Sequence, residues 1–370
     1  MSEPQRIERI AVLLQSLEGG GAQRRVVDLA NGFVGHGCKV DLFLAEQKGA
    51  LADVLAREVR TFPASALPRE LHDQPPDALL SGAAAIHQLA VKSLPPRRNF
   101  PLVLRASSHP HRDLPWSMPR ERLIEKVRRV RRMREYRSAD LIIAVASDVA
   151  DALRTALPEK TIEVIPNRVV TEQFLSGIGR PIDYPWPERP TVPMIVGVGR
   201  LALAKDYPTL LRAFALVRQT REVRLAILGS GSARERHHLL ALAEKLGIQG
   251  DFALLGDSDR VAAWLERASL FVSSSLWEGS PAALIEALAV GCPVVATNSV
   301  GVAREILVDS ELGSLIDPSQ PLMMAQAIVE RLERSHDKDR LRAAADPYRL
   351  DRSQDYLLAV ARCAARLRQD

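Results

Sequence analysis

The sequence predicts an α/β protein built from two Rossmann-like, doubly wound halves with a crevice between them. Strand-like apolar runs alternate with helical patterns along the whole chain. Near the middle the prolines become dense, which indicates a semi-rigid linker; they are Pro181, Pro185, Pro187, Pro190 and Pro193. On each side of this linker the chain opens with a strand, a glycine loop, a helix and another strand. In such folds ligands bind at the carboxyl ends of the strands.

The predicted strands follow from short apolar runs that end in small or polar residues. In the first half they are 9–16, 39–45, 102–107, 140–146 and 162–167. In the second half they are 193–199, 224–229, 251–256, 269–275 and 292–297. We therefore expect a first domain over 1–176, a linker over 177–193 and a second domain over 194–346. The remaining residues, 347–370, predict an amphipathic helix that packs either on the second domain or back on the first.

Composition limits the class of function. The net charge of +5 over 370 residues does not demand nucleic acid, and no basic motif with interleaved aromatic residues is present. The three cysteines, Cys38, Cys292 and Cys363, have neither disulfide nor zinc spacing, which favours a reducing compartment. No run resembles a signal peptide or a membrane span, so a cytoplasmic protein is expected.

The stretch LWEGSPAALIEALAVGCPVVAT, residues 276–297, raises a question about two carboxylates. Pro281 to Val290 predicts a short apolar helix in which Glu286 is the one charged residue. Glu278 lies in the loop that leads into this helix. A buried carboxylate needs a partner. Glu286 therefore either forms an ion pair in the core or binds hydroxyl groups of a sugar or ribose.

A second motif, VGVGRLALAKDYPTLLRAF, places glycines and cations between a strand and a helix. Gly197, Gly199, Arg200 and Lys205 are typical of a loop that faces a phosphate, although a plain surface loop has the same features. The spacing also fits a dinucleotide fingerprint, but the next strand ends in Gly229, Ser230 and Gly231 instead of an acidic residue. The strand over 251–256 likewise ends in a glycine, Gly256.

Taken together, five motifs resemble the retaining GT-B glycosyltransferases with the E-x7-E signature, glycosyl transferases group 1, family 4. EGSPAALIE is similar to that signature, GRLALAKDYPTLLRAF to the phosphate loop, and IEVIPNRV to the IPNGV segment. LAILGSG is similar to a glycine turn of the family, and SLEGGGAQRRVVDLANGF to its amino-terminal glycine loop. The resemblance covers about residues 9 to 310. It implies a GT-B fold, with an acceptor-binding first domain and a second domain that binds the nucleotide sugar.

The resemblance also implies roles for individual residues. Arg200 and Lys205 would bind the donor diphosphate and stabilise the leaving group. Glu286 would bind the ribose hydroxyls, while Glu278 and the backbone from Gly279 through Ser280 and Pro281 to Ala282 would bind the transferred sugar. Gly20 and Gly21 would face the diphosphate or the acceptor. The family often has a histidine near the sugar, and here His109 is favoured over His111.

The expected reaction is retaining transfer of a hexosyl unit from a nucleotide-diphosphate sugar to an acceptor hydroxyl. No acidic pair suited to a metal is evident and cations already serve the leaving group, so we expect no obligatory metal or other cofactor. A UDP-sugar is the favoured donor and a GDP-sugar the second choice. Three alternatives are an epimerase or hydrolase of the same fold, a glycosidase using Glu278 and Glu286, and a non-catalytic binding protein.

The acceptor is expected to be a saccharide or a lipid-linked saccharide. Residues 120–137 predict a basic helix with apolar residues spaced along one face. These are Leu123, Ile124, Val127, Val130 and Met133. Such a helix either lies on an anionic membrane surface or packs on the protein by its apolar residues. On the first interpretation the protein is peripheral on the inner face of the membrane.

Overall fold

The computed structural model describes residues 6–18, 21–47, 49–110, 119–186, 192–299 and 301–367. These residues form two compact units. The first comprises the described residues up to Arg168 and those from Leu350 onward, and the second comprises Val169–Arg349. The division thus falls before the linker expected over 177–193, and residues 187–191 of that linker lie outside the described residues.

The first unit contains a seven-stranded parallel sheet in the order β3-β2-β1-β4-β5-β6-β7. The strands are β1 (Arg9–Ser16), β2 (Lys39–Glu46), β3 (Arg60–Pro63), β4 (Ala78–Ser81), β5 (Leu102–Ala106), β6 (Leu141–Ala144) and β7 (Thr161–Val164). The helices are α1 (Gly21–Gly35), α2 (Leu67–Asp73), α3 (His87–Lys92), α4 (Pro119–Arg137), α5 (Ser147–Ala156) and α14 (Ser353–Leu367), with 3-10 turns η1 (Ala50–Val54) and η2 (Ala64–Ala66).

The last helix, α14, belongs to the first unit although it is the last element of the chain. Its Tyr356 ring lies 6.3 Å from the ring of Phe33 on α1, measured between centroids. Tyr356, Val360 and Cys363 are buried in the same apolar core as β1, α1 and β2. This apolar face explains the amphipathic pattern of the tail, because burying it removes apolar surface from water.

The second unit contains a six-stranded parallel sheet in the order β10-β9-β8-β11-β12-β13. Its strands are β8 (Met194–Val198), β9 (Arg224–Leu228), β10 (Phe252–Gly256), β11 (Leu270–Ser273), β12 (Val294–Thr297) and β13 (Gly313–Ile316). Its helices are α6 (Glu172–Leu175), α7 (Tyr207–Arg218), α8 (Ala233–Lys245), α9 (Val261–Arg267), α10 (Ala282–Ala289), α11 (Val302–Ile306), α12 (Pro321–Glu333) and α13 (Lys338–Ala344), with η3 (Leu203–Lys205) and η4 (Asp346–Tyr348).

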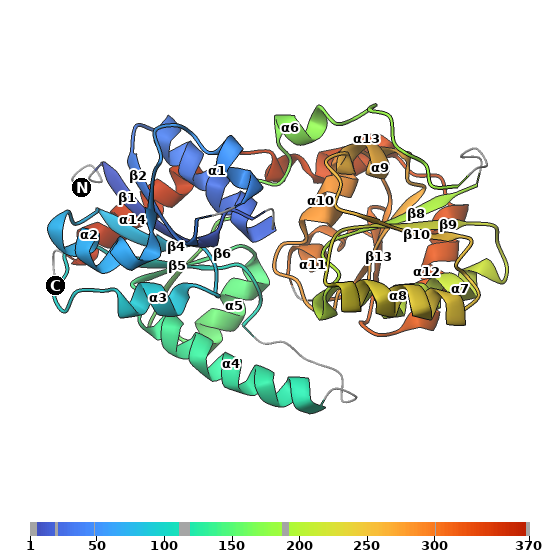
Figure 1. The fold of residues 1–370 in the computed structure, drawn as a ribbon, viewed down its shortest axis with the longest axis horizontal. Helices are drawn as coiled ribbons and strands as arrows, with labels where there is room; N and C mark the ends of the chain where they lie inside the picture. Colours follow the sequence, from blue (N-terminus) through green and yellow to red (C-terminus); the bar gives the residue numbers. More distant parts are fainter. Residues whose placement is uncertain are drawn as a thin grey trace. The chain divides into compact units, whose positions relative to one another are not determined.

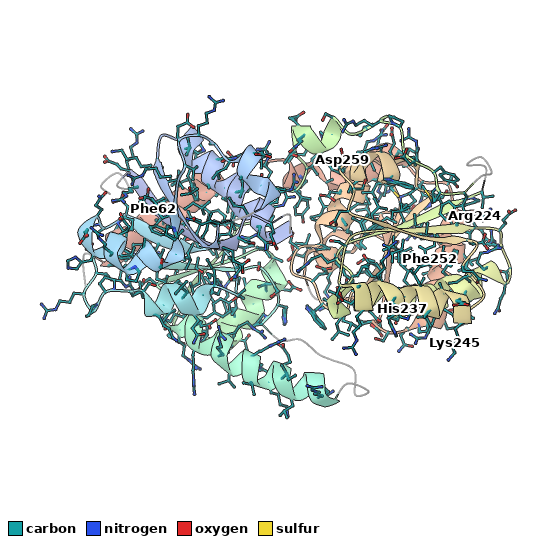
Figure 2. All side chains as sticks on the ribbon, viewed as in Figure 1. Phe62, Arg224, His237, Lys245, Phe252 and Asp259 are labelled. Atoms are coloured by element: carbon teal, nitrogen blue, oxygen red, sulfur yellow. The ribbon has the colours of Figure 1, made fainter. Side chains whose placement is uncertain are left out.

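Helices cover both faces of each sheet, as the doubly wound prediction requires. Figure 1 shows α7 and α8 on one face of the second sheet and α9 and α10 on the other. The strands are accordingly buried on both sides, and their residues are almost all apolar. In Figure 2, Asp259, which follows β10, lies at one end of this sheet, and Arg224, which begins β9, lies at the opposite end.

Every predicted strand overlaps an observed one, but the sequence missed β3, β4 and β13. Each of these has only four residues. β3 ends in a proline and β13 begins with a glycine, and both lie at a sheet edge. Length alone does not explain the miss, because β6, β7, β11 and β12 also have four residues and were predicted. The proline of β3 and the glycine of β13 weaken the strand signal of these two runs.

Candidate functional site

The order of strands in the second sheet reverses between β8 and β11, its first and fourth strands. These two are hydrogen-bonded neighbours, with Ile195 beside Leu270 and Val196 beside Phe271. From β8 the chain proceeds outward in one direction and from β11 in the other. The loops that leave such a pair diverge, which creates the usual ligand position of a doubly wound sheet. The loop after β8 contains Arg200 and Lys205, and the loop after β11 contains Glu278.

An ion pair joins these two loops. The ammonium group of Lys205, at the end of η3, donates to Oε1 of Glu278. The side chains are 22% and 17% exposed, so both charges are largely shielded from water. The backbones are also connected, because the amide of Leu276 donates to the carbonyl of Ala204 at 2.8 Å. The sequence selected both charged residues, but as separate ligand contacts, and it did not predict that they pair.

Three hydroxyl side chains that the sequence did not select support Glu278 and the backbone of the two loops. Ser275 Oγ donates to Oε1 of Glu278 at 2.9 Å. Thr297, at the end of β12, donates to the carbonyl of Ser275 at 2.5 Å, and Ser274 donates to the carbonyl of Lys205 at 2.6 Å. All three hydroxyl residues are at most 1% exposed. The one signal for them in the sequence is a run of serines at the end of an apolar strand.

Tyr207, the first residue of α7, completes the group around the ion pair. Its hydroxyl donates to the carbonyl of Gly199 at 2.9 Å. Burial, and then the nearby Glu278 carboxylate, raise the pKa of this phenol well above its ordinary value. Tyr207 therefore remains a neutral hydrogen-bond donor, which fixes the loop that presents Lys205.

The predicted glycines lie at the carboxyl ends of three neighbouring strands. Gly199, Gly229 and Gly256 follow or end β8, β9 and β10 and have φ of 147°, 144° and 77°. The amide of Gly229 donates to the carbonyl of Gly256 at 2.7 Å. A Cβ on Gly229 would lie 2.0 Å from the carbonyl oxygen of Gly199, and one on Gly231 would lie 2.5 Å from the Leu201 Cβ. Close packing against the backbone of Gly199 and against Leu201 is therefore sufficient to require glycine at 229 and 231.

The loop after Glu278 leads into the amino terminus of α10. Pro281 is the N-cap of this helix, and no side chain caps it. Free amide groups at this end favour negative charge. Ser280 Oγ is buried and has no hydrogen-bond partner among the described residues. Glu286 lies on α10 and is half-buried.

The backbone of this loop is held from the side of α11. The amide of Val302 donates to the carbonyl of Gly279 at 3.2 Å. Gly301 has φ of 126°, and a Cβ there would lie 2.5 Å from the same carbonyl oxygen. The loop of Gly279, Ser280, Pro281 and Ala282 thus depends on a glycine outside the predicted motif.

Arg200 is exposed and forms no hydrogen bond or ion pair with the residues that the structure describes. It lies between Gly199 and the loop that carries Lys205, so its guanidinium is available to a ligand. Among the described residues no cluster of histidine, cysteine or carboxylate side chains could hold a metal ion.

The first unit contains the remaining predicted residues. Gly21 begins α1 after β1, and His109 follows β5, so both lie at the carboxyl end of the first sheet. A Cβ on Gly21 would meet no atom within 4 Å, so the fold does not require glycine there. His109 is half-buried. Gly20 and His111 lie outside the described residues.

Arg105 is a candidate that sequence reasoning missed. It lies on β5 and is 1% exposed. Its guanidinium donates to the carbonyl of Gly82, after β4, at 3.1 Å, and to Oδ1 of Asn167. Within the described part of the chain it forms no ion pair, and its Nε has no partner. A buried charge without a counter-ion is costly, which makes Arg105 a candidate for contact with an anionic group. The signal was a single cation in the apolar run LVLRA.

Asp206, next to Lys205, yields a prediction on pH. It has φ of 43°, and its carboxylate accepts from Thr209 Oγ1 at 2.7 Å. Burial raises its pKa in the folded protein. The folded state therefore holds the proton more tightly than the unfolded state, and stability falls as pH rises through the window above about 4.

Asp206→Asn removes this ionisation, keeps the oxygen acceptor and tolerates a positive φ. We expect the variant to gain stability relative to the wild type between about pH 4 and 7. Urea unfolding at a series of pH values measures the difference. If the free energies of unfolding of the two proteins differ by the same amount at about pH 3 as at pH 7, ionisation of Asp206 is not the cause of the difference.

The two parallel sheets, each wound outward in both directions from its first strand, define the GT-B class of fold. Sucrose-phosphate synthase from Thermosynechococcus elongatus has a TM-score of 0.73 to this chain at 18% identity, over 98% of both chains. HepE from Anabaena, solved in complex with UDP-glucose, has a TM-score of 0.70 at 16% identity, over 98% of this chain and 99% of that one.

Sequence comparison identifies the family. Residues 183–346 match the model of Glycosyl transferases group 1, and residues 19–173 match that of Glycosyltransferase Family 4. The chain belongs to this glycosyltransferase family.

Two curated relatives illustrate the range of similarity. The lipopolysaccharide core biosynthesis glycosyltransferase LpsE of Rhizobium meliloti is 28% identical over 84% of each chain. The N-acetylgalactosamine-N,N'-diacetylbacillosaminyl-diphospho-undecaprenol 4-alpha-N-acetylgalactosaminyltransferase of Campylobacter jejuni is 35% identical over 40% of this chain. That match spans 39% of the Campylobacter enzyme, well under two thirds of its length.

Proposed function

We propose that the protein is a retaining glycosyltransferase that moves a hexosyl unit from a nucleotide-diphosphate sugar to an acceptor hydroxyl. The product would be a cell-surface polysaccharide, a lipid-linked glycan or another glycoconjugate. The observation that carries this proposal is the Lys205–Glu278 pair between β8 and β11, with Arg200 exposed beside it. A cation and a carboxylate at this point suit the two parts of a nucleotide sugar, its diphosphate and its hydroxyl groups.

Breaking the bond between the anomeric carbon and the diphosphate leaves negative charge on the leaving oxygen. Arg200, Lys205 and the uncapped amino terminus of α10 would stabilise that charge in place. Lys205 has a carboxylate partner without the donor, so binding of the diphosphate would let it share its charge between Glu278 and a phosphate. Because these cations supply the electrostatic stabilisation, we propose that the transfer needs no divalent metal.

Glu278 would then accept hydrogen bonds from hydroxyl groups of the transferred sugar. Its second carboxylate oxygen, Oε2, is not used by Lys205 or Ser275, both of which contact Oε1. Glu286 would bind the ribose hydroxyls, and its half-buried position on α10 is compatible with that role. Among the first-unit residues, His109 and Gly21 remain proposed contacts of the sugar and the acceptor.

UDP-sugars are the favoured donors, and HepE, of the same fold, was solved with UDP-glucose. The acceptor would be a saccharide or a lipid-linked saccharide, as the name of the Campylobacter relative describes for that enzyme. No described helix has both the length and the apolar character needed to cross a membrane. We propose that the protein reaches a lipid-linked acceptor as a peripheral protein on an anionic membrane surface.

Ligand-dependent thermal stability tests the donor site. UDP, GDP, ADP, dTDP and their common sugar conjugates would be added to the wild type with and without magnesium. A ligand at about 100 times its Kd stabilises the native state by roughly 2.7 kcal/mol, which raises Tm by several degrees. We expect one nucleotide series, UDP first, to produce this shift without magnesium.

Glu286→Ala is expected to lose the shift, whereas Glu244→Ala, a change of an exposed carboxylate on α8, should retain it. If no nucleotide stabilises the wild type, the donor site is wrong and a non-catalytic role with another ligand is favoured. Sugar release without an acceptor would instead indicate a hydrolase. Proton NMR of the transferred linkage decides between retention and inversion.

A further inference from the structure

The exposed face of helix α4 differs from that of an ordinary surface helix. Its large apolar side chains point into solvent: Leu123 is 65% exposed, Val127 66%, Val130 54% and Ile124 40%. Leu123, Val127 and Val130 follow the spacing i, i+4, i+7, so they form one row. One of the two interpretations of the sequence was that this row packs on the body of the protein. The exposure of the row shows that this interpretation is wrong.

Charged groups occupy the opposite, inward face of α4. Glu125, Arg132 and Glu135 are 9%, 7% and 6% exposed. Arg132 forms an ion pair with Glu125 and donates to the carbonyl of Pro110 at 3.0 Å. These contacts fix the rotation of the helix about its axis. The ion pair and the hydrogen bond of Arg132 therefore determine that the charged side chains face the protein and the aliphatic side chains face solvent.

The border of the apolar row is cationic. Helical spacing places Arg120, Lys126, Arg134 and Arg137 along it, and all four are exposed. None of them forms an ion pair with a residue that the structure describes. The acidic side chains Glu125 and Glu135 are turned inward, so they do not offset this charge. In Figure 1, α4 lies on the outer side of the first unit, beyond α3 and α5.

We infer that α4 is a membrane-docking helix that lies in the interface of an anionic lipid bilayer with Leu123, Val127 and Val130 inserted. Aliphatic side chains enter the boundary between headgroups and acyl chains, while the surrounding arginines contact lipid phosphates and extend their stems along the surface. A second copy of this face would bring like charges together, and a nucleic acid would leave the aliphatic row in water. An anionic bilayer offers phosphates to the cationic side chains and an apolar interior to the aliphatic row.

This inference rests on the proposed function for one point only, that the acceptor is carried by a lipid. Docking would bring the enzyme to such an acceptor, because it would hold the protein at the membrane surface where the lipid lies. Docking itself requires neither donor nor acceptor. It can therefore fail while sugar transfer succeeds, and the reverse is also possible.

Co-sedimentation of the full chain with vesicles tests the inference. Vesicles of phosphatidylglycerol and phosphatidylcholine are expected to bind the wild type, with weaker binding as salt rises, and vesicles of phosphatidylcholine alone to bind far less. The variant Leu123→Glu/Val127→Glu places two carboxylates in the row. We expect it to lower the partition coefficient at least about tenfold, since insertion is lost and the local charge falls.

The matched control is Val308→Glu/Leu322→Glu, which changes two exposed apolar residues of the second unit, 82% and 59% exposed, by the same net charge. It should bind anionic vesicles like the wild type. Circular dichroism and transfer to a water-soluble acceptor are expected to be unchanged in both variants, which separates docking from folding and from catalysis. The inference would be overturned if the wild type and the α4 variant bound anionic vesicles equally well. It would also be overturned if the control variant lost as much vesicle binding as the α4 variant. Binding to random-sequence nucleic acid or self-association through α4, without vesicle binding, would assign the face to those partners instead.

Discussion

Glu278→Gln is expected to lower the rate of sugar transfer by about 10² to 10³, with the fold retained. The amide cannot form the ion pair with Lys205 and is a weaker acceptor for sugar hydroxyls. Lys205→Met should cause a loss of similar size, because it removes a cation from the leaving group and leaves Glu278 without its charged partner. Steady-state kinetics with the donor identified by thermal shift provides the measurement.

The two residues should also be coupled. If they act as one unit, the double variant will be much less impaired than the product of the two single losses predicts. Glu330 and Arg334, which pair at 2.6 Å on the surface of the second unit, serve as the control, with Glu330→Gln and Arg334→Met. That exposed pair should contribute at most about 1 kcal/mol to stability and nothing to the rate. A Glu278→Gln enzyme with the wild-type rate would exclude the carboxylate from the reaction.

Gly229→Ala is expected to produce the largest loss of stability among the glycine variants of the site. A side chain at φ of 144° is strained, and the new Cβ would lie 2.0 Å from the carbonyl oxygen of Gly199. Since the obstacle is backbone at the end of a buried strand, relief requires β8 and β9 to separate. We expect a loss of about 3 kcal/mol or more, or roughly 6–12 °C in Tm, measured by urea and thermal unfolding.

The matched control is Gly250→Ala in the same unit, where an added Cβ meets no atom within 4 Å. Its stability should stay within about 0.5 kcal/mol of the wild type. Because the Gly199 carbonyl also accepts from Tyr207, Gly229→Ala should weaken nucleotide binding as well. Wild-type stability of the Gly229→Ala variant would mean that the strand ends are not packed as the structure places them.

Local sequence patterns were sufficient to predict most of the fold. Alternation of apolar strands with amphipathic helices predicted the doubly wound class, and the run VGVGRLALAK predicted where a phosphate loop begins. The edge strands β3 and β13 were missed because a proline in one and a glycine in the other weaken the strand signal, and nothing in the structure explains the miss of β4. The residues that support the site, Ser275, Thr297 and Gly301, were missed for a different reason. Thr297 and Gly301 each contact a loop that is distant in the sequence, and such a contact leaves no local pattern. Ser275 contacts Glu278 only three residues away, but it stands in a run of serines that does not show which of them makes the contact.

The sequence by itself selected the candidate residues for the chemistry: Arg200, Lys205, Glu278 and Glu286, near glycines at strand ends. Only the tertiary structure decided which of them meet. Lys205 and Glu278 are 73 residues apart in the chain and become partners because β8 and β11 are adjacent at the reversal of strand order. The same holds for α4, where the sequence specified an apolar row and a basic row, but the Glu125–Arg132 pair and the Pro110 contact determined which row faces solvent. Periodicity is a property of neighbouring residues, whereas strand order and helix rotation are decided by contacts between distant ones.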